Sequence, residues 1–502
     1  MAAHRMRGAR ELLATTLDRQ SFVSWDSVPG DVAPNPTYAA ELERARERSG
    51  TDEAVLTGEG RLHGRRVAVV AGEFAFLAGS IGLAAAERLV AAVERATTER
   101  LPLLAAPASG GTRMQEGTLA FLAMVKISAA VTAHKAAGLP YLVYLRHPTT
   151  GGVFASWGSQ GHVTVAEPGA LIGFLGPRVY ESLYGESFPP GVQTAENLYR
   201  HGLVDAVVAP EDLPGIADRA LGVIQDGPGG AEPPEAPLWA RAQIPDTPAW
   251  DAITRSRRRD RPGVRALLRY GAKDVVPLSG TGAGERDPGL LLALARFGDM
   301  PCVLVGQDRQ RQSSERPLGP GALRAARRGM HMAEELGLGL VTVIDTPGAA
   351  LSREAEEGGM AGEIARCLAE MARLRAPTVS LLLGQGTGGG ALALVPADRV
   401  VAAQHAWLSP LPPEGASAIM HRTVDYAPQL AAEQGVRSVD LRQSGIVDVI
   451  VPEHEDAATE VESFCARVAD QLRYELAKLG QTDPAVRLRR RAERYRELGS
   501  VT

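Results

Sequence analysis

Two glycine-rich stretches carry the residues whose types and spacing best suit chemistry. Thr149–Val153 (TTGGV) follows the apolar run Leu139–Leu145, and Gly384–Ala391 (GQGTGGGA) follows the apolar run Pro377–Leu383. Glycine leaves the backbone bare, and free N–H groups where a strand gives way to a helix can hold an anion or a developing oxyanion. Both stretches therefore indicate a reaction in which the main chain stabilises negative charge.

The second stretch also matches a dinucleotide-binding fingerprint, Gly384-x-Gly386-x-x-Gly389. A Rossmann helix needs more residues than the chain leaves before Pro396 and the next predicted strand, Arg399–Ala403. We therefore reject a nucleotide site. Taken alone, the stretch would also suit a tight turn or a close helix contact.

Each glycine-rich stretch has a partner turn upstream, Ser109–Gly111 (SGG) for the first and Thr346–Gly348 (TPG) for the second. Gly152 lies 41 positions after Gly111, and Gly389 lies 41 positions after Gly348. Matching segments also follow downstream, Gly202–Asp205 (GLVD) and Gly445–Asp448 (GIVD). The chain therefore contains one fold twice, and its paired donor turns suit a reaction with two developing negative charges.

Short apolar strands that alternate with amphipathic helices must position these turns in both halves. The first half has predicted helices at Gly82–Thr97 and Thr118–Ala137, and predicted strands at Val67–Ala71, Leu101–Ala106, Leu139–Leu145, Val163–Ala166 and Ala170–Gly173. The second half has predicted helices at Gly321–Leu336 and Glu354–Arg373, and predicted strands at Cys302–Val305, Leu340–Ile344, Pro377–Leu383, Arg399–Ala403 and Ile446–Val451. This alternation predicts an α/β layer architecture.

The predicted domain boundaries follow the composition of the chain. Residues 1–53 form a polar, partly helical extension, and residues 54–226 form the first domain. A Gly/Pro linker covers 227–237, and the second domain covers 238–502. Its basic terminal helix, Val486–Leu498, is expected to dock on its own domain or on a partner subunit rather than on nucleic acid.

Composition excludes several classes of protein. The chain has 502 residues, 45% of them hydrophobic, and a net charge of −5, which gives no global attraction to nucleic acid or to an anionic membrane. Its three cysteines lie far apart without a CxxC pair, so we expect no metal site and a reducing compartment. No apolar run reaches about 18 residues without a charge, and we expect a cytoplasmic protein.

The first half contains four longer motifs, which are Gly72–Gly79 (GEFAFLAG), Ser109–Gly117 (SGGTRMQEG), Pro148–Ser156 (PTTGGVFAS) and Ala166–Arg178 (AEPGALIGFLGPR). On these motifs, residues 54–212 resemble the β subunit of bacterial acetyl-CoA carboxylase carboxyltransferase. Residues 236–500 resemble the α subunit, through Ile344–Ala349 (IDTPGA), Glu363–Arg375, Gly386–Ala393 (GTGGGALA), Pro413–Ile419 (PEGASAI) and the terminal LRRRAERYRELG. The resemblance implies a β–α fusion of two tandem crotonase-like (ClpP/crotonase) ββα-superhelix domains.

The resemblance implies transfer of a carboxyl group from carboxybiotin, carried on a separate protein, to the α-carbon of a short acyl-CoA. Acetyl-CoA giving malonyl-CoA, as in fatty acid biosynthesis, would be the main reaction, through an enolate held by two backbone oxyanion holes. By the family pattern, Gly151 and Gly152 would serve the thioester, and Gly390 and Ala391 the biotin. The implied substrate-binding residues are Ser109, Gly110, Gly111, Arg113, Arg178, Gly348, Gly388 and Gly389.

Single side chains near the turns are weaker candidates. Arg113 and Arg178 could orient a turn or contact a CoA phosphate. Glu414 is expected to cap a helix rather than act as an acid. The nearby histidines are expected to be structural, and they are His147, His162, His405 and His421.

The chain departs from the family at two points. The family's β subunit usually begins with a four-cysteine zinc ribbon, which this sequence lacks, and the chain has no Met-Lys pair for a biotinyl-lysine. It also has no region of the size of an ATP-grasp domain. The resemblance therefore implies biotin carboxylase and biotin carboxyl carrier protein as partners, and a homodimer or higher homo-oligomer.

Two other functions stay open. A biotin-independent decarboxylase of malonyl or methylmalonyl thioesters would use the same enolate hole, and a non-catalytic scaffold subunit of a carboxylase complex would need neither turn. Both turns are intact, which favours catalysis. The sequence leaves the acyl chain and the pathway undetermined.

Overall fold

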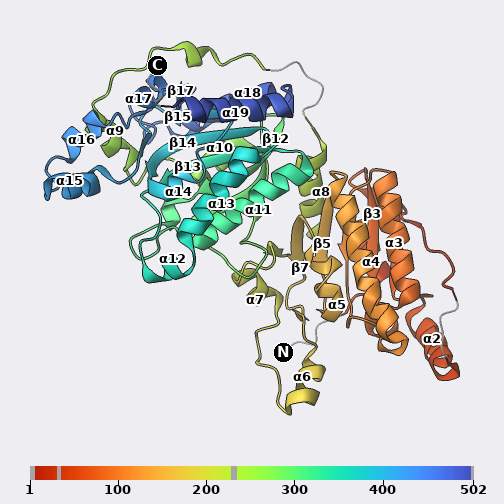
Figure 1. The fold of residues 1–502 in the computed structure, drawn as a ribbon. Coiled ribbons are helices and arrows are strands. Elements are labelled where there is room, and N and C mark those ends of the chain that lie inside the picture. Colours follow the sequence, from red (N-terminus) through yellow and green to blue (C-terminus); the bar gives the residue numbers. More distant parts are fainter. Residues whose placement is uncertain (1–5, 31–34, 228–233, 499–502) are drawn as a thin grey trace. The chain divides into compact units, whose positions relative to one another are not determined.

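The computed structural model describes residues 6–30, 35–227 and 234–498. The chain forms two compact units: unit 1 comprises Met1–Leu221 and Gly282–Gly284, and unit 2 comprises Gly222–Thr281 and Glu285–Thr502. Each unit is a sheet flanked by helices (Figure 1). Parts of the predicted N-terminal extension (1–5 and 31–34) and of the predicted linker (228–233) lie outside the described residues. The predicted domain boundaries stay a prediction.

The main sheet of unit 1 has the strand order β1-β2-β3-β4-β5-β7-β9. Strands β1 to β3 pair antiparallel, and from β3 onward the pairs are parallel. A separate parallel pair is formed by β6 and β8. The strands are β1 (Val23–Ser24), β2 (Val55–Leu62), β3 (Arg65–Gly72), β4 (Leu103–Ala106), β5 (Tyr141–Leu145), β6 (Thr149–Thr150), β7 (Val163–Ala166), β8 (Ile172–Gly173) and β9 (Ala206–Val207).

Helices α3 and α4 of unit 1 pack against each other beside the sheet (Figure 1). The helix α3 turns Ala85, Leu89 and Val93 inward, at the spacing that places residues on one helical face. The helices are α1 (Ala9–Thr16), α2 (Pro36–Ser49), α3 (Leu83–Thr98), α4 (Gly117–Ala136), α5 (Gly151–Phe154), α6 (Pro177–Tyr184), α7 (Ala195–Arg200) and α8 (Leu213–Gln225), of which α8 spans the division between the units.

Unit 2 repeats the same order, β10-β11-β12-β13-β14-β15-β17, with β16 paired to the end of β14. Its first two pairs are antiparallel and the following ones parallel. The strands are β10 (Ala272–Leu278), β11 (Leu290–Phe297), β12 (Met300–Gln307), β13 (Gly339–Thr346), β14 (Thr378–Thr387), β15 (Arg399–Ala403), β16 (Trp407–Ser409) and β17 (Val449–Val451).

Helices cover both faces of the unit 2 sheet. A Cβ at Gly329 of α11 would lie 2.5 Å from Val305 of β12, whereas the next residue of that strand, Gly306, faces Val264 of α10. The helices are α9 (Ala249–Ser256), α10 (Val264–Gly271), α11 (Pro320–Leu336), α12 (Arg353–Glu357), α13 (Met360–Arg373), α14 (Gly388–Leu392), α15 (Pro413–His421), α16 (Ala427–Glu433), α17 (Ser438–Gln443), α18 (Val461–Gly480) and α19 (Pro484–Glu497).

The shared strand order confirms the predicted α/β fold with one architecture used twice. Strands β5, β7 and β14 are buried along their whole length, because parallel strands are covered on both faces and hence appear in the sequence as unbroken apolar runs. The predicted terminal helix, present as α19, docks on its own unit through the buried residues Arg487 and Arg491.

Several predicted element boundaries were wrong. The helix predicted over Glu354–Arg373 is two helices, α12 and α13, because Gly359 between them has a left-handed φ of 80°. The glycine stretch from Gly384 is not wholly a turn, since β14 continues to Thr387 by pairing with β16. Strands β2, β10 and β11 were not predicted.

Among the described residues, one segment, Met114–Ala136, is long and apolar enough to cross a membrane by length and composition. Core helices of soluble proteins pass the same test, and this helix packs on α3. Part of its apolar surface is exposed, including Leu119, Phe121, Leu122 and Val125.

Candidate functional site

The two upstream turns have the same hydrogen bonding. In unit 1 the Ser109 hydroxyl accepts a bond from the Gly111 N–H at 3.0 Å, and in unit 2 the Thr346 hydroxyl accepts one from the Gly348 N–H at 3.1 Å. Gly111 has a φ of 109° and Gly348 a φ of 137°, which L side chains rarely adopt. The hydroxyl and the glycine two residues later therefore set the shape of each turn.

The two downstream turns also match. Gly151 begins α5 with a φ of 63°, and Gly388 begins α14 with a φ of 65°. Each follows a strand of the short second layer, β6 against β8 in unit 1 and the end of β14 against β16 in unit 2. Gly151 and Gly388 are therefore structural equivalents, and the next residues, Gly152 and Gly389, also correspond.

In unit 1 the upstream and downstream turns touch through bare backbone. A Cβ at Gly151 would lie 3.3 Å from the Cα of Gly111, and a Cβ at Gly111 would lie 3.4 Å from the Cα of Gly151. The Thr150 N–H donates to the Ser109 carbonyl at 2.9 Å and fixes the contact. Ser109, Gly111 and Gly151 are thus brought together as the sequence predicted.

The predicted donor pair of unit 1 is only half available. The Gly151 N–H donates to the Phe174 carbonyl at 3.0 Å, and the Gly110 N–H donates to Ala78 at 2.8 Å. The Gly152 N–H, in the first turn of α5, has no acceptor among the described residues. Within the predicted pair, the geometry therefore leaves Gly152 as the donor that can hold an oxyanion.

In unit 2 the same logic favours Gly389 and Gly390 over Ala391. Gly389 and Gly390 occupy the second and third positions of α14, where N–H groups have no intrahelical acceptor. Ala391 is the fourth residue, and its N–H faces the carbonyl of the cap residue Thr387. A Cβ at Gly390 would lie 3.2 Å from Leu318 and 3.3 Å from the Cβ of Ala349, so a side chain there would crowd these two residues.

A buried glutamine that the sequence did not single out braces the unit 2 turn. Gln307 donates from its side-chain amide to the Gly390 carbonyl at 2.7 Å and accepts from the Asp345 N–H at 3.1 Å. Asp345 in turn accepts from the Gln385 N–H at 3.1 Å. Gln307 ends β12, two residues beyond the predicted strand Cys302–Val305, and no sequence pattern marks such a contact across 83 residues.

Arg113, two residues after Gly111, lies in the interior of unit 1, and its contact with a CoA phosphate stays a prediction. Arg113 is fully buried and makes a two-pronged ion pair with Glu53, at 2.5 and 2.7 Å, and donates to the Ser80 carbonyl at 2.7 Å. Burial alone would lower the pKa of Arg113, but the hydrogen bonds and charge of Glu53 raise it. Arg113 therefore anchors the loop that carries Gly111. Arg178 lies in α6, and its side chain is outside the described part of the chain.

Glu414 is the second residue of α15, in its first turn, and the helix-capping residue is Pro412. Glu414 pairs with Arg257, at 2.5 and 3.0 Å, and the hydrogen bonds from Arg257 lower the pKa of its carboxyl group. The nearby histidines have structural partners: His147 accepts from Leu171 N–H at 3.0 Å, and His162 accepts from Tyr141 N–H at 3.0 Å. His405 lies 2.8 Å from the buried carboxylate of Glu453.

Metal ligands and reactive thiols do not contribute to the site. Within residues 6–30, 35–227 and 234–498, no three His, Cys, Asp or Glu side chains are placed to hold a metal ion. All three cysteines are buried, and burial raises the pKa of each thiol to about 12.

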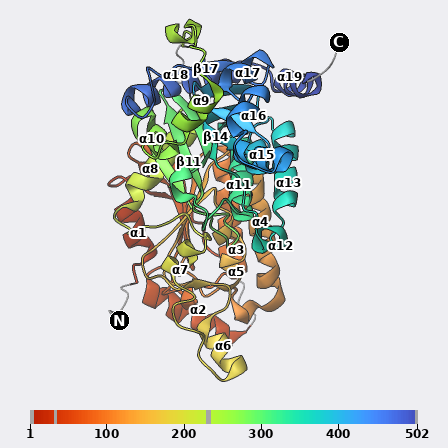
Figure 2. The ribbon, with the colours of Figure 1, turned by 90° about the vertical axis from the view of Figure 1, so that its left-hand side faces the viewer.

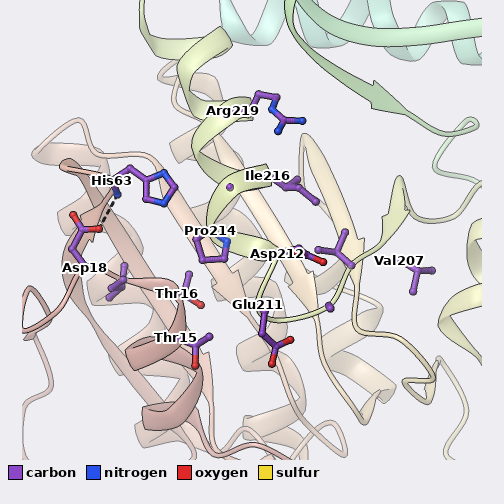
Figure 3. A pocket seen from close by; sticks show the side chains of 14 residues that line it. Thr15, Thr16, Asp18, His63, Val207, Glu211, Asp212, Pro214, Ile216 and Arg219 are labelled. Carbon is purple, nitrogen blue, oxygen red and sulfur yellow. Dashed lines mark hydrogen bonds between the residues drawn. The ribbon is translucent and has the colours of Figure 1, made fainter.

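Unit 1 also contains a cavity of about 690 Å³ (Figure 3). It is lined by residues at the end of α1, including Thr16, and by residues of α8, including Ile216. None of the predicted site residues lines it.

Comparison with known proteins places the chain in one family. The model of the carboxyl transferase domain matches residues 8–491. The chain is 62% identical over 489 residues to the probable biotin-dependent acyl-coenzyme A carboxylase beta3 subunit of Mycobacterium tuberculosis, covering 97% of this chain and 98% of that protein. It is 36% identical over 513 residues to the acetyl-coenzyme A carboxylase carboxyl transferase subunits beta/alpha of Saccharopolyspora erythraea, covering 99% and 90%.

Two solved structures share the fold. Transcarboxylase 12S with methylmalonyl-coenzyme A and methylmalonic acid bound has a TM-score of 0.70 at 21% identity, covering 92% of this chain and 89% of that chain. A single-chain, multi-domain long-chain acyl-CoA carboxylase has a TM-score of 0.68 at 19% identity, covering 90% of this chain and 45% of that chain. These likenesses concern the fold alone.

Proposed function

We propose that this chain, which belongs to the carboxyl transferase domain family and is a biotin-dependent acyl-CoA carboxyltransferase, acts on short acyl-CoA and converts acetyl-CoA to malonyl-CoA. The observation that carries the proposal is the duplicated turn. Each unit has main-chain N–H groups at a helix start for which the described residues offer no acceptor, that of Gly152 in unit 1 and those of Gly389 and Gly390 in unit 2.

Two such turns match the charge that the reaction develops. Bound carboxybiotin would provide both the carbon dioxide that the enolate carbon attacks and, after the N–C bond breaks, the ureido nitrogen that takes the α-proton. The Gly152 N–H would stabilise the thioester oxygen as the enolate forms. Gly389 and Gly390 would hold the ureido oxygen of biotin. Because Gly390 has no side chain, this oxygen could approach its main chain closely. Preorganised donors of this kind contribute about 2.7–4 kcal/mol each.

The surroundings of Gly152 support a short acyl group. A Cβ at Gly152 would lie 3.0 Å from the Thr112 hydroxyl and 3.4 Å from Met124, so Thr112 and Met124 fill the space beside this turn. We infer that a long acyl chain does not fit on this side.

The carrier and carboxylase functions belong to partner proteins, as in biotin-dependent carboxylases. For the oligomeric state we propose a homo-oligomer, at least a dimer. Apolar side chains are exposed in the single chain, on α4 in unit 1 and on α15 in unit 2, where Ile419 and Met420 are 70% and 61% exposed. Patches of this kind mark protein contacts.

The decisive assay follows the loss of malonyl-CoA and of methylmalonyl-CoA by the purified full chain, with and without free biotin. We expect loss that depends on biotin, and faster loss of malonyl-CoA. Conversion to acetyl-CoA without biotin would instead establish the decarboxylase. Inactivity towards both substrates, also with the carboxylated carrier protein and acetyl-CoA, would leave the scaffold function.

A further inference from the structure

A second polar site lies in unit 2, at the end of the sheet opposite the glycine turn. It is a cavity of about 350 Å³ between the end of α18, α19, the first residue of β15 and the turn before β17. Arg399 begins β15 beside Val379 at the start of β14, whereas the glycine turn follows the end of β14. In Figures 1 and 2, α18 and α19 lie at one end of unit 2, and α12 lies at the other end.

The lining of this cavity has an excess of positive charge, with six cationic side chains and three carboxylates. All three carboxylates are already engaged. Asp398 accepts from Arg491 at 2.8 Å, and Asp448 accepts from Arg399 at 2.6 Å and from Arg494 at 2.8 Å. Glu475 accepts from Arg399 at 2.9 Å. Of the other three cations, Lys478 and Arg490 form no ion pair with a described carboxylate, and Arg487 lies 3.9 Å from an oxygen of Asp398, which also pairs with Arg491.

Arg487 is the buried cation of this group, with 6% of its surface exposed. Its terminal nitrogens donate to the backbone carbonyls of Leu479, Thr482 and Arg375, which carry no charge. Its Nε has no acceptor in the part of the chain that the structure describes, and the nearest carboxylate oxygen, of Asp398, is 3.9 Å away. Burial and the charge of Arg491 lower the pKa of Arg487.

Arg494 repeats this pattern at the cavity wall, because its Nε is also buried without an acceptor among the described residues. Two buried guanidinium N–H groups thus remain unpaired beside one cavity. An unpaired buried donor is costly, and a bound anion would satisfy it. The same anion would oppose the lowering of the Arg487 pKa that burial and Arg491 cause.

Lys478 and Arg490 stand at the exposed side of the cavity. No carboxylate of the described chain pairs with either side chain, and the Lys478 ammonium lies 5.7 Å from the ring centre of Tyr474. Because neither cation holds the fold together through an ion pair, both are free to contact a ligand.

We propose that this cavity binds a compact polyanion of the phosphate or diphosphate class. A ligand with two or three negative charges would balance the excess of three cations over carboxylates. The volume lies at the lower end of the range for small-molecule pockets, about 300–1,000 Å³, and does not admit a nucleic-acid strand. Guanidinium and ammonium groups are also the usual partners of phosphate oxygens.

The test measures binding of inorganic pyrophosphate to the full chain by titration calorimetry in a phosphate-free buffer. We expect saturable binding at one site per chain. The double variant Lys478→Gln/Arg490→Gln should weaken it at least about 10-fold, because each substitution removes a charge-assisted hydrogen bond. The matched control is Arg489→Gln, which removes a charge from the same helix at a residue that does not line the cavity.

Thermal melting of the unliganded variants checks that the fold is intact, and this readout does not depend on the proposed carboxyltransferase activity. An absence of pyrophosphate binding would overturn the proposal. The proposal would also be overturned if Arg489→Gln lost as much affinity for pyrophosphate as the double variant, because such a loss would indicate only general attraction of the anion to a basic helix. Titration with ADP and with inorganic phosphate distinguishes the sources: tighter binding of ADP indicates a nucleotide, and equal binding of ADP and pyrophosphate indicates recognition of the diphosphate alone.

Discussion

At the residue scale, the site depends on positions that lack a side chain. Gly111 and Gly151 meet through their Cα atoms, and both have a left-handed φ, so a side chain at either one would clash and strain the backbone. Gly152 and Gly390 have no such φ, and only the space around them is restricted. These two are therefore the residues at which a substitution tests the donor function rather than the backbone conformation.

We expect Gly152→Val and Gly390→Val each to lower kcat at least about 100-fold, the cost of losing one oxyanion donor. The added methyl groups meet Thr112 and Met124 in the first case and Leu318 and Ala349 in the second, and displace the turn. Biotin-dependent loss of malonyl-CoA measures the effect.

The control variants are Gly215→Ala and Gly480→Ala, at glycines that have nothing within 4 Å of an added Cβ. They should keep wild-type turnover. Turnover near wild type in Gly152→Val or Gly390→Val, with circular dichroism showing a folded protein, would contradict the assignment of that turn.

At the element scale, the sequence predicted the buried parallel strands well and the other strands poorly. An unbroken apolar run such as Tyr141–Leu145 identifies a strand that is covered on both faces. Strands β2 and β10 include Gly58, Glu59 and Pro277, which disfavour strands, and both are held in place by antiparallel neighbours that only the fold supplies.

The candidate site likewise combines features that the sequence reveals with contacts that only the fold creates. The glycine turns could be located from sequence because their spacing is repeated. Two other features could not be located from sequence: the hydrogen bond from the Gly151 N–H to Phe174 and the ion pair of Arg113 with Glu53. Each joins residues that are distant in sequence and have no characteristic spacing.

Helix α4 contains a pH-sensitive residue. His134 is fully buried, its Nδ1 lies 2.9 Å from the Thr97 hydroxyl of α3, and burial lowers its pKa to about 4. The unfolded chain, with a histidine pKa of about 6.5, binds this proton more readily. Its contribution to stability is therefore complete above about pH 6.5 and is lost as the pH falls towards 4.

We expect His134 to make the free energy of unfolding of unit 1 about 2 kcal/mol lower at pH 5 than at pH 7.5. In His134→Gln, which does not titrate, this part of the difference should disappear. Urea denaturation of both proteins at the two pH values measures it. His201→Gln, at an exposed histidine of the same unit, is the control and should retain the wild-type difference; an unchanged difference in His134→Gln would contradict the assignment.

At the scale of the whole molecule, one architecture is used twice in a single chain. Each unit presents its own turn and its own exposed apolar surface, and the proposed assembly of copies would cover these surfaces. On α4, Leu119, Phe121 and Val125 are each more than 60% exposed. Aspartate at such positions would place charge in an apolar contact, which is strongly unfavourable.

We expect Phe121→Asp/Val125→Asp to shift the protein from an oligomer towards the 53.1 kDa monomer, measured by size-exclusion chromatography with light scattering. Thr132→Asp, at an exposed residue further along α4, should leave the mass unchanged. An unchanged mass in the double variant would show that α4 lies outside the assembly contact.

The use of main-chain donors also determines how catalysis responds to acidity. Peptide N–H groups do not titrate while the protein stays folded, so the electrostatic potential that the glycine turns offer to an oxyanion is the same in acid and in alkali. The ionised Glu414 is held by Arg257 and provides no switch. Under the proposed function, a slope in the rate against pH would therefore originate in groups other than these main-chain donors, such as the reactants, or in the integrity of the fold.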